Sequence, residues 1–359
     1  MQIGRVGIII LISLIIFEHS WCHPASVSAN DWVYTGNMSC NRAYHAASLL
    51  ANGKVLVTGG SNIAVGWNTV ELYDPSTGRW TFTGNMSSVH ALHTASTLKN
   101  GKILVAGGGT TTAELYDYET GRWTVTGSMK IRRSLHTASV LNNGKVLVVG
   151  GLDIVRSAEL YDPVTGRWTE AASLNYDRQY HTATVLADGR VLVVGGYEKS
   201  AEIYDPSTGR WTLTGDLVEA RVMHTAILLK DGKVLVAGGF GQTVEYPTST
   251  DIYDPTTNTW TRTDDGVVVG LMLKMGLLHD GRVISAGGQF LDPEKKLRSP
   301  SQGAFIYDPS TGHWTDISFM HTYRSDHTLT VLSDGRALVV GGMDMYATFS
   351  AELYDPTKS

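Results

Sequence analysis

The hydrophobic pattern of this chain consists of short β-prone stretches separated by turn residues. In one stretch near the middle, Leu135–Leu141 is followed by Asn143-Gly144 and then by the apolar run Lys145–Val149. An Asn-Gly pair between apolar runs favours a tight hairpin, because both central residues of that turn need positive φ. The continuous, β-branched character of the second run predicts a strand that is buried on both faces.

Two more strands complete the unit. Gly150-Gly151 ends the buried strand, at a place where a backbone without side chains can approach closely. Ser157–Tyr161 reads as a third strand, Asp162–Gly166 has turn chemistry, and Arg167–Thr169 opens a fourth strand. The unit therefore predicts a four-stranded antiparallel sheet, whose strands are called a, b, c and d in chain order.

This unit recurs along nearly the whole chain. The Gly-Gly pairs begin at Gly59, Gly107, Gly150, Gly195, Gly238, Gly287 and Gly341, at spacings of 48, 43, 45, 43, 49 and 54 residues. The Tyr-Asp pairs begin at Tyr73, Tyr116, Tyr161, Tyr204, Tyr253, Tyr307 and Tyr354, and all but the last are followed by Trp80, Trp123, Trp168, Trp211, Trp260 and Trp314. Repeats of this period indicate a solenoid, a propeller or an array, and we expect the aromatic residues to pack between the units.

The seventh unit is divided between the two ends. The chain stops at Ser359 without a tryptophan after Tyr354, whereas Asp31–Met38 copies the Arg79–Met86 segment of the first full unit. A linear array has no reason to split a unit, so the division predicts a closed ring. Seven small sheets arranged radially bury their faces against one another. We therefore expect an all-β, seven-bladed propeller with four antiparallel strands per blade, in which the N-terminal strand completes the last blade.

The repeat resembles the kelch motif from Trp32 to Pro356, and its style is similar to the propeller of galactose oxidase and related copper-radical oxidases. Arg42-Ala43-Tyr44-His45 and Arg178-Gln179-Tyr180-His181 match the R-x-Y-H segment that supplies a Tyr-His pair of copper ligands in that family. This chain departs from the family pattern in three ways. Two segments match equally well, Cys40 lies in the same segment as Tyr44, and no further domain follows to supply the last histidine. We therefore expect no cofactor, with copper required only if the chain is such an oxidase.

The N-terminal residues differ from the repeats. Arg5 precedes the apolar run Val6–Phe17, which is shorter than the roughly 20 residues that span a bilayer. With the small residues of Val27–Ala29, this pattern predicts a signal peptide at 1–29, cleaved between about 22 and 29, followed by the propeller at 30–359. An uncleaved anchor is the alternative. We expect a secreted, extracellular protein with no membrane span in the mature chain.

Charge and cysteine content narrow the function classes. The net charge of −5, from 29 basic and 34 acidic residues, gives no basic surface for nucleic acid. Cys22 and Cys40 are the only cysteines, and they form a disulfide only if cleavage falls before Cys22. Asn37 and Asn85 begin N-x-S sequons at the same place in two consecutive units, which makes both candidate glycosylation sites.

Polar residues recur at three positions of the unit. A histidine opens strand a at His45, His93, His136, His181, His224 and His327. Three residues earlier lies Arg42, Arg133, Arg178, Arg221 or Arg324, and strand c carries Glu71, Glu114, Glu159, Glu202, Asp251 or Glu352. The sixth unit has Gly270, Leu273 and Phe305 instead. Since it lacks all three together, we predict one polar network per blade, placed near the channel mouth with Tyr44 and Tyr180 and structural in role, with no metal.

Strand alternation places the d–a and b–c loops on one face, which we call the loop face. The a–b and c–d turns, which vary little, lie on the other, the turn face. Variable loops on a rigid scaffold are where binding residues concentrate. The candidate binding residues are Trp67, Tyr197, Phe240, Phe290, Lys295, Lys296 and Arg298, four of which belong to the long insertion of the sixth unit.

These patterns favour a binding platform for an extracellular protein or glycan. The sequence has no G-x-S-x-G, H-E-x-x-H or C-x-x-C motif and no phosphate-binding loop. Two enzymatic alternatives stay open, a copper-radical oxidase of sugars or alcohols and a metal-independent sugar isomerase. A structural component of an extracellular matrix is a further alternative.

Overall fold

The computed structural model describes residues 31–62, 64–152, 156–196, 198–241, 249–263, 270–292 and 297–358. The predicted signal peptide and Cys22 lie outside these residues. The described part is built from strands only. Within it, no helix has the length and apolar character that a bilayer crossing requires.

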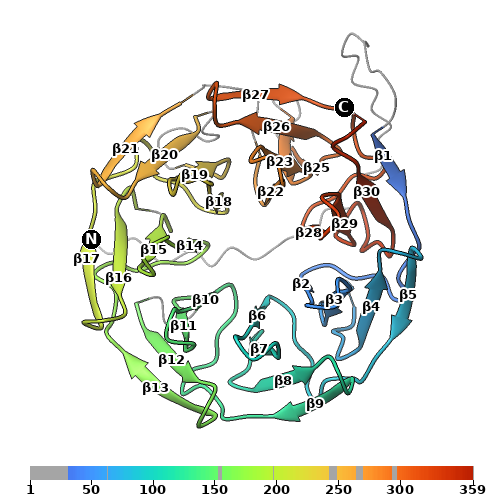
Figure 1. Cartoon of the computed structure of the whole chain (residues 1–359), viewed down its shortest axis with the longest axis horizontal. Helices are drawn as coiled ribbons and strands as arrows, with labels where there is room; N and C mark the ends of the chain where they lie inside the picture. The colour runs from blue at the N-terminus through green and yellow to red at the C-terminus, as the bar shows by residue number, and fades with distance from the viewer. Residues whose placement is uncertain are drawn as a thin grey trace.

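Seven four-stranded antiparallel sheets surround a central opening (Figure 1). Blade one comprises β2 (Ala46–Leu49), β3 (Val55–Thr58), β4 (Val70–Asp74) and β5 (Arg79–Phe82). Blade two comprises β6 (His93–Thr97), β7 (Ile103–Gly107), β8 (Ala113–Asp117) and β9 (Arg122–Val125). Blade three comprises β10 (Thr137–Val140), β11 (Val146–Val149), β12 (Ala158–Asp162) and β13 (Arg167–Ala171). Blade four comprises β14 (Thr182–Val185), β15 (Val191–Val194), β16 (Ala201–Asp205) and β17 (Arg210–Leu213).

The remaining blades follow the same order. Blade five comprises β18 (Thr225–Leu228), β19 (Val234–Ala237), β20 (Asp251–Asp254) and β21 (Thr259–Arg262). Blade six comprises β22 (Lys274–Leu277), β23 (Val283–Ala286), β26 (Ala304–Asp308) and β27 (His313–Asp316). Its insertion forms a separate hairpin of β24 (Gln289–Asp292) and β25 (Leu297–Pro300). Blade seven comprises β28 (Thr328–Val331), β29 (Ala337–Val340), β30 (Ala351–Tyr354) and the N-terminal β1 (Trp32–Tyr34).

Pairing of the two ends closes the ring, as the divided unit predicted. β1 runs antiparallel to β30, with Trp32 opposite Tyr354 and Tyr34 opposite Glu352 (Figure 1). Trp32 is fully buried, and its ring centroid lies 5.3 Å from that of Tyr354. The seven-bladed, all-β propeller expected from the sequence is confirmed.

The core lies between the blades. The b strands are buried along their whole length, and each hydrophobic cluster joins residues of two neighbouring sheets. In one cluster, Leu104 of blade two packs with Val146 and Val148 of blade three. A single blade therefore leaves its apolar faces exposed, and burial of these faces requires neighbours on both sides.

The repeated aromatic residues also connect neighbouring blades. The Tyr161 hydroxyl lies 2.8 Å from Thr126 Oγ1, and Trp168 Nε1 donates to the Gly127 carbonyl at 2.7 Å, so both contacts cross from blade three to blade two. The Tyr161 and Trp168 rings lie 5.1 Å apart. Equivalent contacts recur in blades one and two. The predicted packing of the aromatic series between units is therefore observed, with hydrogen bonds added.

A narrow ring of backbone surrounds the channel. The residue before the strand-a histidine, or before Leu273 in blade six, has positive φ, and these residues are Tyr44, Leu92, Leu135, Tyr180, Met223, Met272 and Asp326. We call them the inner ring. Five hydrogen bonds join consecutive members; for example, Leu92 N donates to the Tyr44 carbonyl at 3.0 Å, and Tyr44 N donates to the Asp326 carbonyl at 3.1 Å. Positive φ is costly for residues with side chains, so the blade-to-blade hydrogen bonds offset local strain.

Candidate functional site

The d–a segments and b–c loops lie on the same face, as the strand directions require. Backbone bridges tie them together, for example between Ala43 and Ser61 and between Val222 and Phe240. The last bridge of this kind joins Ser325 to Met343 in blade seven. The loop face is thus built from pairs of segments held by the sheets below.

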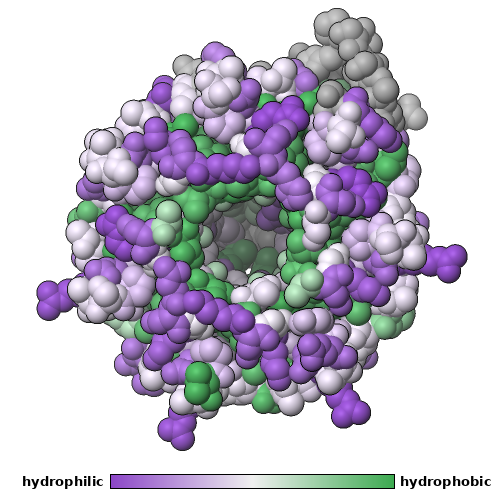
Figure 2. All heavy atoms as spheres, in the orientation of Figure 1, coloured by the Kyte–Doolittle hydropathy of each residue, from purple (hydrophilic) through white to green (hydrophobic). Residues whose placement is uncertain are grey.

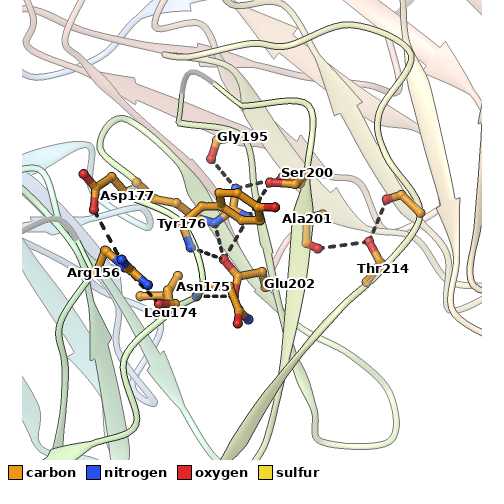
Figure 3. A network of polar contacts seen from close by, with 12 residues as sticks. Arg156, Leu174, Asn175, Tyr176, Asp177, Gly195, Ser200, Ala201, Glu202 and Thr214 are labelled. Atoms are coloured by element: carbon orange, nitrogen blue, oxygen red, sulfur yellow. Dashed lines mark hydrogen bonds and ion pairs between the residues drawn. The ribbon is translucent and has the colours of Figure 1, made fainter.

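A buried arginine links these segments inside most blades. In blade four, Arg178 Nη1 donates to the carbonyls of Gly195 and Ser200, both at 2.7 Å, and Nε donates to Glu202 Oε1 at 3.0 Å. The Glu202 carboxylate also accepts the backbone N–H groups of Asn175 and Tyr176 (Figure 3). Burial lowers the pKa of Arg178, and the Glu202 carboxylate opposes this effect. The pair therefore fixes the d–a segment, the Gly-Gly pair and strand c to one another.

The same arrangement recurs with small changes. Arg42, Arg133, Arg221 and Arg324 pair with Glu71, Glu159, Asp251 and Glu352 at 2.8–3.1 Å, and each of these arginines is at most 1% exposed. In blade two, His90 takes the place of arginine, with Nε2 at 3.4 Å from Glu114 Oε1. These arginines do not line the channel, contrary to the expected channel-mouth position, because their side chains lie inside the blades.

Blade six replaces the polar set with apolar packing, as expected. Leu273 and Phe305 belong to one buried cluster, against which Phe290 of the insertion packs. A Cβ atom on Gly270 would meet Leu273 at 3.3 Å and Phe290 at 3.6 Å, so the glycine leaves room for these side chains. The complete exchange avoids the cost of leaving one buried charge unpaired.

The histidines form a separate series that runs between blades. His181 Nε2 lies 2.9 Å from Thr137 Oγ1 of blade three, and His136 Nε2 lies 3.0 Å from Thr94 Oγ1 of blade two. His45, His93 and His224 likewise contact a threonine of the preceding blade. The predicted single network of arginine, histidine and carboxylate is therefore two networks, one within each blade and one between blades.

Burial keeps these imidazoles neutral. Desolvation lowers the pKa of His45, His136 and His181 to about 3, and the nearest arginine contributes in each case. A neutral imidazole has one donor and one acceptor nitrogen. The Nδ1 atoms of His45, His136 and His181 are buried without a hydrogen-bond partner, so the histidine series is only half satisfied.

The inner ring and the histidine series line a cavity at the loop-face end of the channel. Its volume is about 350 Å³, and Thr182, Thr225, Leu273, Lys274 and Thr328 complete its wall. Figure 2 shows hydrophobic residues on the walls of the central opening and hydrophilic residues on the surrounding face. Burial, with help from Asp326 and Tyr180, raises the pKa of Tyr44 to about 12, so its hydroxyl stays protonated.

The loop candidates fall into different environments. Trp67 is half-buried, and its Nε1 donates to the Asn41 carbonyl at 3.1 Å, so it fills the loop rather than projecting from it. Phe240 is half-buried beneath Arg298, whose guanidinium carbon lies 5.2 Å from the Phe240 ring centroid. This contact joins blade five to the blade-six insertion. Tyr197, Lys295 and Lys296 lie outside the described residues.

A group of exposed apolar side chains on blade seven was missed in the sequence. Tyr323, Met345, Tyr346 and Phe349 are 41–61% exposed. Their two segments are joined by the Ser325–Met343 bridge, and Met38 N donates to the Phe349 carbonyl at 2.9 Å. We call these four residues the blade-seven patch. The b–c loop Met343–Ser350 carries three of them, so its length and aromatic content were the available signal.

The remaining candidates are near the surface of the same face. Asn37 and Asn85 are exposed in d–a segments, in equivalent places. Cys40 is a free, half-buried thiol, and its backbone N–H faces Glu71 at 3.3 Å.

The imidazoles of the two R-x-Y-H segments are directed toward a neighbouring blade. His45 Nε2 lies 3.0 Å from Thr328 Oγ1, and His181 Nε2 is bonded to Thr137, so both imidazoles are directed between blades. Among the described residues, no three His, Cys, Asp or Glu side chains are grouped to hold a metal ion. Copper also needs its ligands to converge on one ion at bonding distance.

The fold and the loop face define a seven-bladed propeller with a varied face around the mouth of its channel. Kelch motif models match residues 42–87, 132–175, 178–217 and 224–264, so the propeller carries kelch motifs. A comparison with curated proteins gave no match. A solved fungal alcohol oxidase of the AA5 family, in complex with copper, is similar with a TM-score of 0.78 and 18% identity. The likeness covers 92% of this chain and 77% of that one, and confirms the expected galactose oxidase-like propeller fold.

Proposed function

We propose that this kelch propeller is a secreted, non-catalytic platform that binds an extracellular protein through its loop face. The blade-seven patch is the observation that supports this function most strongly. Solvent-exposed aromatic and methionine side chains are enriched at the centres of protein interfaces. The patch stands on a rigid sheet and a tied loop, so little ordering is needed on binding.

Variation between blades also supports the loop face as the binding surface. The b–c loops differ in length and composition, while the a–b and c–d turns repeat the same Asp-Gly and Asp-Pro chemistry. A face with the same residues in every blade discriminates poorly between partners. The exposed sequons Asn37 and Asn85 fit a secreted route, and treatment of protein from a secretory host with a glycosidase tests their occupancy.

A binding screen tests the proposed function. The purified mature chain is screened against extracellular proteins and glycans, and each hit is remeasured with the double variant Tyr346→Ser/Phe349→Ser. We expect a protein hit whose affinity falls about tenfold or more, because truncating interface anchors costs about 2 kcal/mol or more. Val164→Ser is the matched control, since Val164 is 92% exposed on the turn face. Hits that lose affinity equally in the control, or glycan hits alone, would overturn the proposal.

A copper-dependent oxidase is the second candidate, favoured by the fold likeness to the copper-containing alcohol oxidase. The orientation of His45 and His181 opposes it. Stoichiometric copper in purified protein, with oxidase activity lost in Tyr44→Phe or Tyr180→Phe, would establish it. A sugar isomerase using the arginines is disfavoured because these side chains are buried in ion pairs; turnover of sugars would reverse that conclusion.

A further inference from the structure

One position of the repeat, in the channel wall, holds a charged residue in blade six and an uncharged residue in every other blade. The residue after the strand-a histidine is Thr94, Thr137, Thr182, Thr225 or Thr328, and blade one has Ala46. Blade six has Lys274, which lines the cavity and is half-buried. Within the described residues, Lys274 Nζ has no hydrogen-bond or ion-pair partner. A buried ammonium without a partner is costly, so its presence in the cavity needs an explanation.

The substitution leaves His327 without the threonine partner that the other histidines have. In the other histidine-bearing blades, imidazole Nε2 contacts a threonine hydroxyl of the preceding blade. His327 follows blade six, where Lys274 stands in place of that threonine, and neither ring nitrogen of His327 has a side-chain hydrogen-bond partner. The backbone of Ala286 acts on the buried ring, which is 1% exposed and lines the cavity. The imidazole therefore lies beside the same cavity as the unpaired ammonium.

Asp326 supplies the opposite charge nearby. It occupies the inner-ring position that holds leucine, methionine or tyrosine in the other blades. Its carboxylate accepts a hydrogen bond from Ser325 Oγ at 3.1 Å, and its charge acts on Lys274, yet the two do not form an ion pair within 4.0 Å. Since the histidines are neutral, Lys274 and Asp326 are the basic and acidic groups of the described cavity wall, and burial lowers the pKa of Lys274 and raises the pKa of Asp326.

The rest of the wall combines neutral histidines and threonines with apolar inner-ring side chains. Leu92, Leu135, Met223 and Met272 contribute to the inner ring, and the aromatic rings of Tyr44 and Tyr180 line the same cavity. The volume of about 350 Å³ is at the lower end of the range of small-molecule sites. The cavity thus combines two separated, opposite charges with an apolar arc.

We propose that the channel mouth binds a small zwitterion, an α-amino acid with an apolar side chain. The ligand carboxylate pairs with Lys274 and accepts from His327, the ligand ammonium pairs with Asp326, and the side chain packs on the Leu and Met residues. A simple anion or cation gains from one wall charge and is repelled by the other. A zwitterion satisfies both, and charge-assisted hydrogen bonds of this kind are stronger than neutral ones. This site is separate from the blade-seven patch and does not depend on the proposed protein binding.

Calorimetric titration of the mature protein with leucine and methionine tests the site. The matched probes are N-acetyl-leucine, leucinamide and N-acetyl-leucinamide, which lack one or both charges, and glucose as a neutral polyol. We expect binding of the free amino acids and an affinity at least about tenfold lower for each blocked derivative. Tighter binding of glucose or of a singly charged derivative, or no binding by any probe, would overturn the proposal.

Two variants connect the binding to the residues. Lys274→Thr restores the threonine found in five of the other blades and gives His327 its usual partner, so we expect a folded protein that has lost amino acid binding. Asp326→Leu restores the inner-ring residue of blades two and three and should also lose binding. Val164→Ser, at an exposed turn-face position away from the cavity, is the control and should retain the wild-type affinity within about threefold. Wild-type affinity in Lys274→Thr would contradict the assignment even if amino acids bind.

Discussion

At the scale of single residues, side-chain length decides whether the buried ion pairs are complete. The glutamates of the arginine pairs reach the backbone N–H groups of the d–a segment, as Glu202 does at Asn175 with a distance of 2.8 Å. Asp251 pairs with Arg221 through Oδ2, but its Oδ1 is buried without a hydrogen bond. The missing methylene leaves one acceptor unmet, and an unmet buried acceptor is costly.

Asp251→Glu is therefore expected to stabilise the protein by about 1 kcal/mol, because the longer side chain can reach the d–a backbone. Denaturant unfolding of the variant and the wild type measures the difference. Glu202→Asp is the reverse change in blade four and should destabilise by a similar amount. A less stable Asp251→Glu protein would show that the blade-five pocket cannot admit the extra methylene.

The sequence pattern identified the paired residues but not their partners. Arg178 and Glu202 were expected to interact because blade six lacks the equivalents of both residues. The two side chains do form an ion pair. His181 was placed in the same group, but it contacts Thr137 of the preceding blade. Co-occurrence within a repeat cannot distinguish contacts inside a blade from contacts between blades. The positive φ of residues such as Leu135 and Met223 could not be predicted from the sequence either, because residues with these side chains do not favour that conformation.

At the scale of one blade, the arginine–carboxylate pair joins segments that the sheet hydrogen bonds leave apart. Arg178 holds strand c, the Gly-Gly pair and the preceding d–a segment in one cluster. Blade six shows that a blade can form without this cluster when apolar residues replace all its members. The pair therefore specifies the loop geometry of a blade. Stability is lost when one partner is removed and the other is left as an unpaired buried charge.

A double-mutant cycle on blade four tests this view. Arg178→Met alone leaves the Glu202 carboxylate buried and should destabilise by about 3–5 kcal/mol. Arg178→Met/Glu202→Leu removes both charges and should be distinctly more stable than the single variant. Unfolding free energies of the four proteins give the coupling energy. A double variant at least as unstable as the sum of the two single changes would contradict the pairwise account.

At the scale of the whole molecule, the same kinds of contact recur between neighbouring blades around the ring. A condition that weakens one of these contacts therefore weakens several of them at once. Each blade contributes an inner-ring residue and all but blade six contribute a histidine, and these contacts run around the channel. The architecture could be predicted in full because the divided unit encodes closure. The charged groups of the channel could not be predicted, because the roles of Lys274 and Asp326 depend on their being close to His327 and to each other in the folded ring.

The neutral histidines predict acid lability of the ring. The unfolded chain takes up protons on these imidazoles below about pH 6.5, whereas the folded protein resists protonation until about pH 3 at His45, His136 and His181. Stability is therefore complete above about pH 6.5 and falls as the pH drops toward 3. Each histidine contributes a slope of up to about 1.4 kcal/mol per pH unit. Thermal unfolding between pH 8 and pH 4 measures this dependence.

His136→Gln is the matched variant for the acid response. The free energy of unfolding of this variant should depend less steeply on pH, because unfolding takes up about one proton fewer when one buried titrating group is gone. An unchanged pH dependence in this variant, or a wild-type protein equally stable at pH 7 and pH 4.5, would show that the imidazoles do not control acid unfolding.

The pairing of β1 with β30 has a consequence for how the protein is made. The first propeller strand to leave the ribosome finds its partner only after the strands of six blades have been translated. At about 5–20 residues per second, β1 waits on the order of tens of seconds with an unmatched edge. Blades one to six can assemble during that interval, but the nascent ring stays open until β30 has been translated. The split blade therefore exposes the edge of β1 throughout synthesis, and this exposure would disappear in a circular permutant whose new ends fall between two blades.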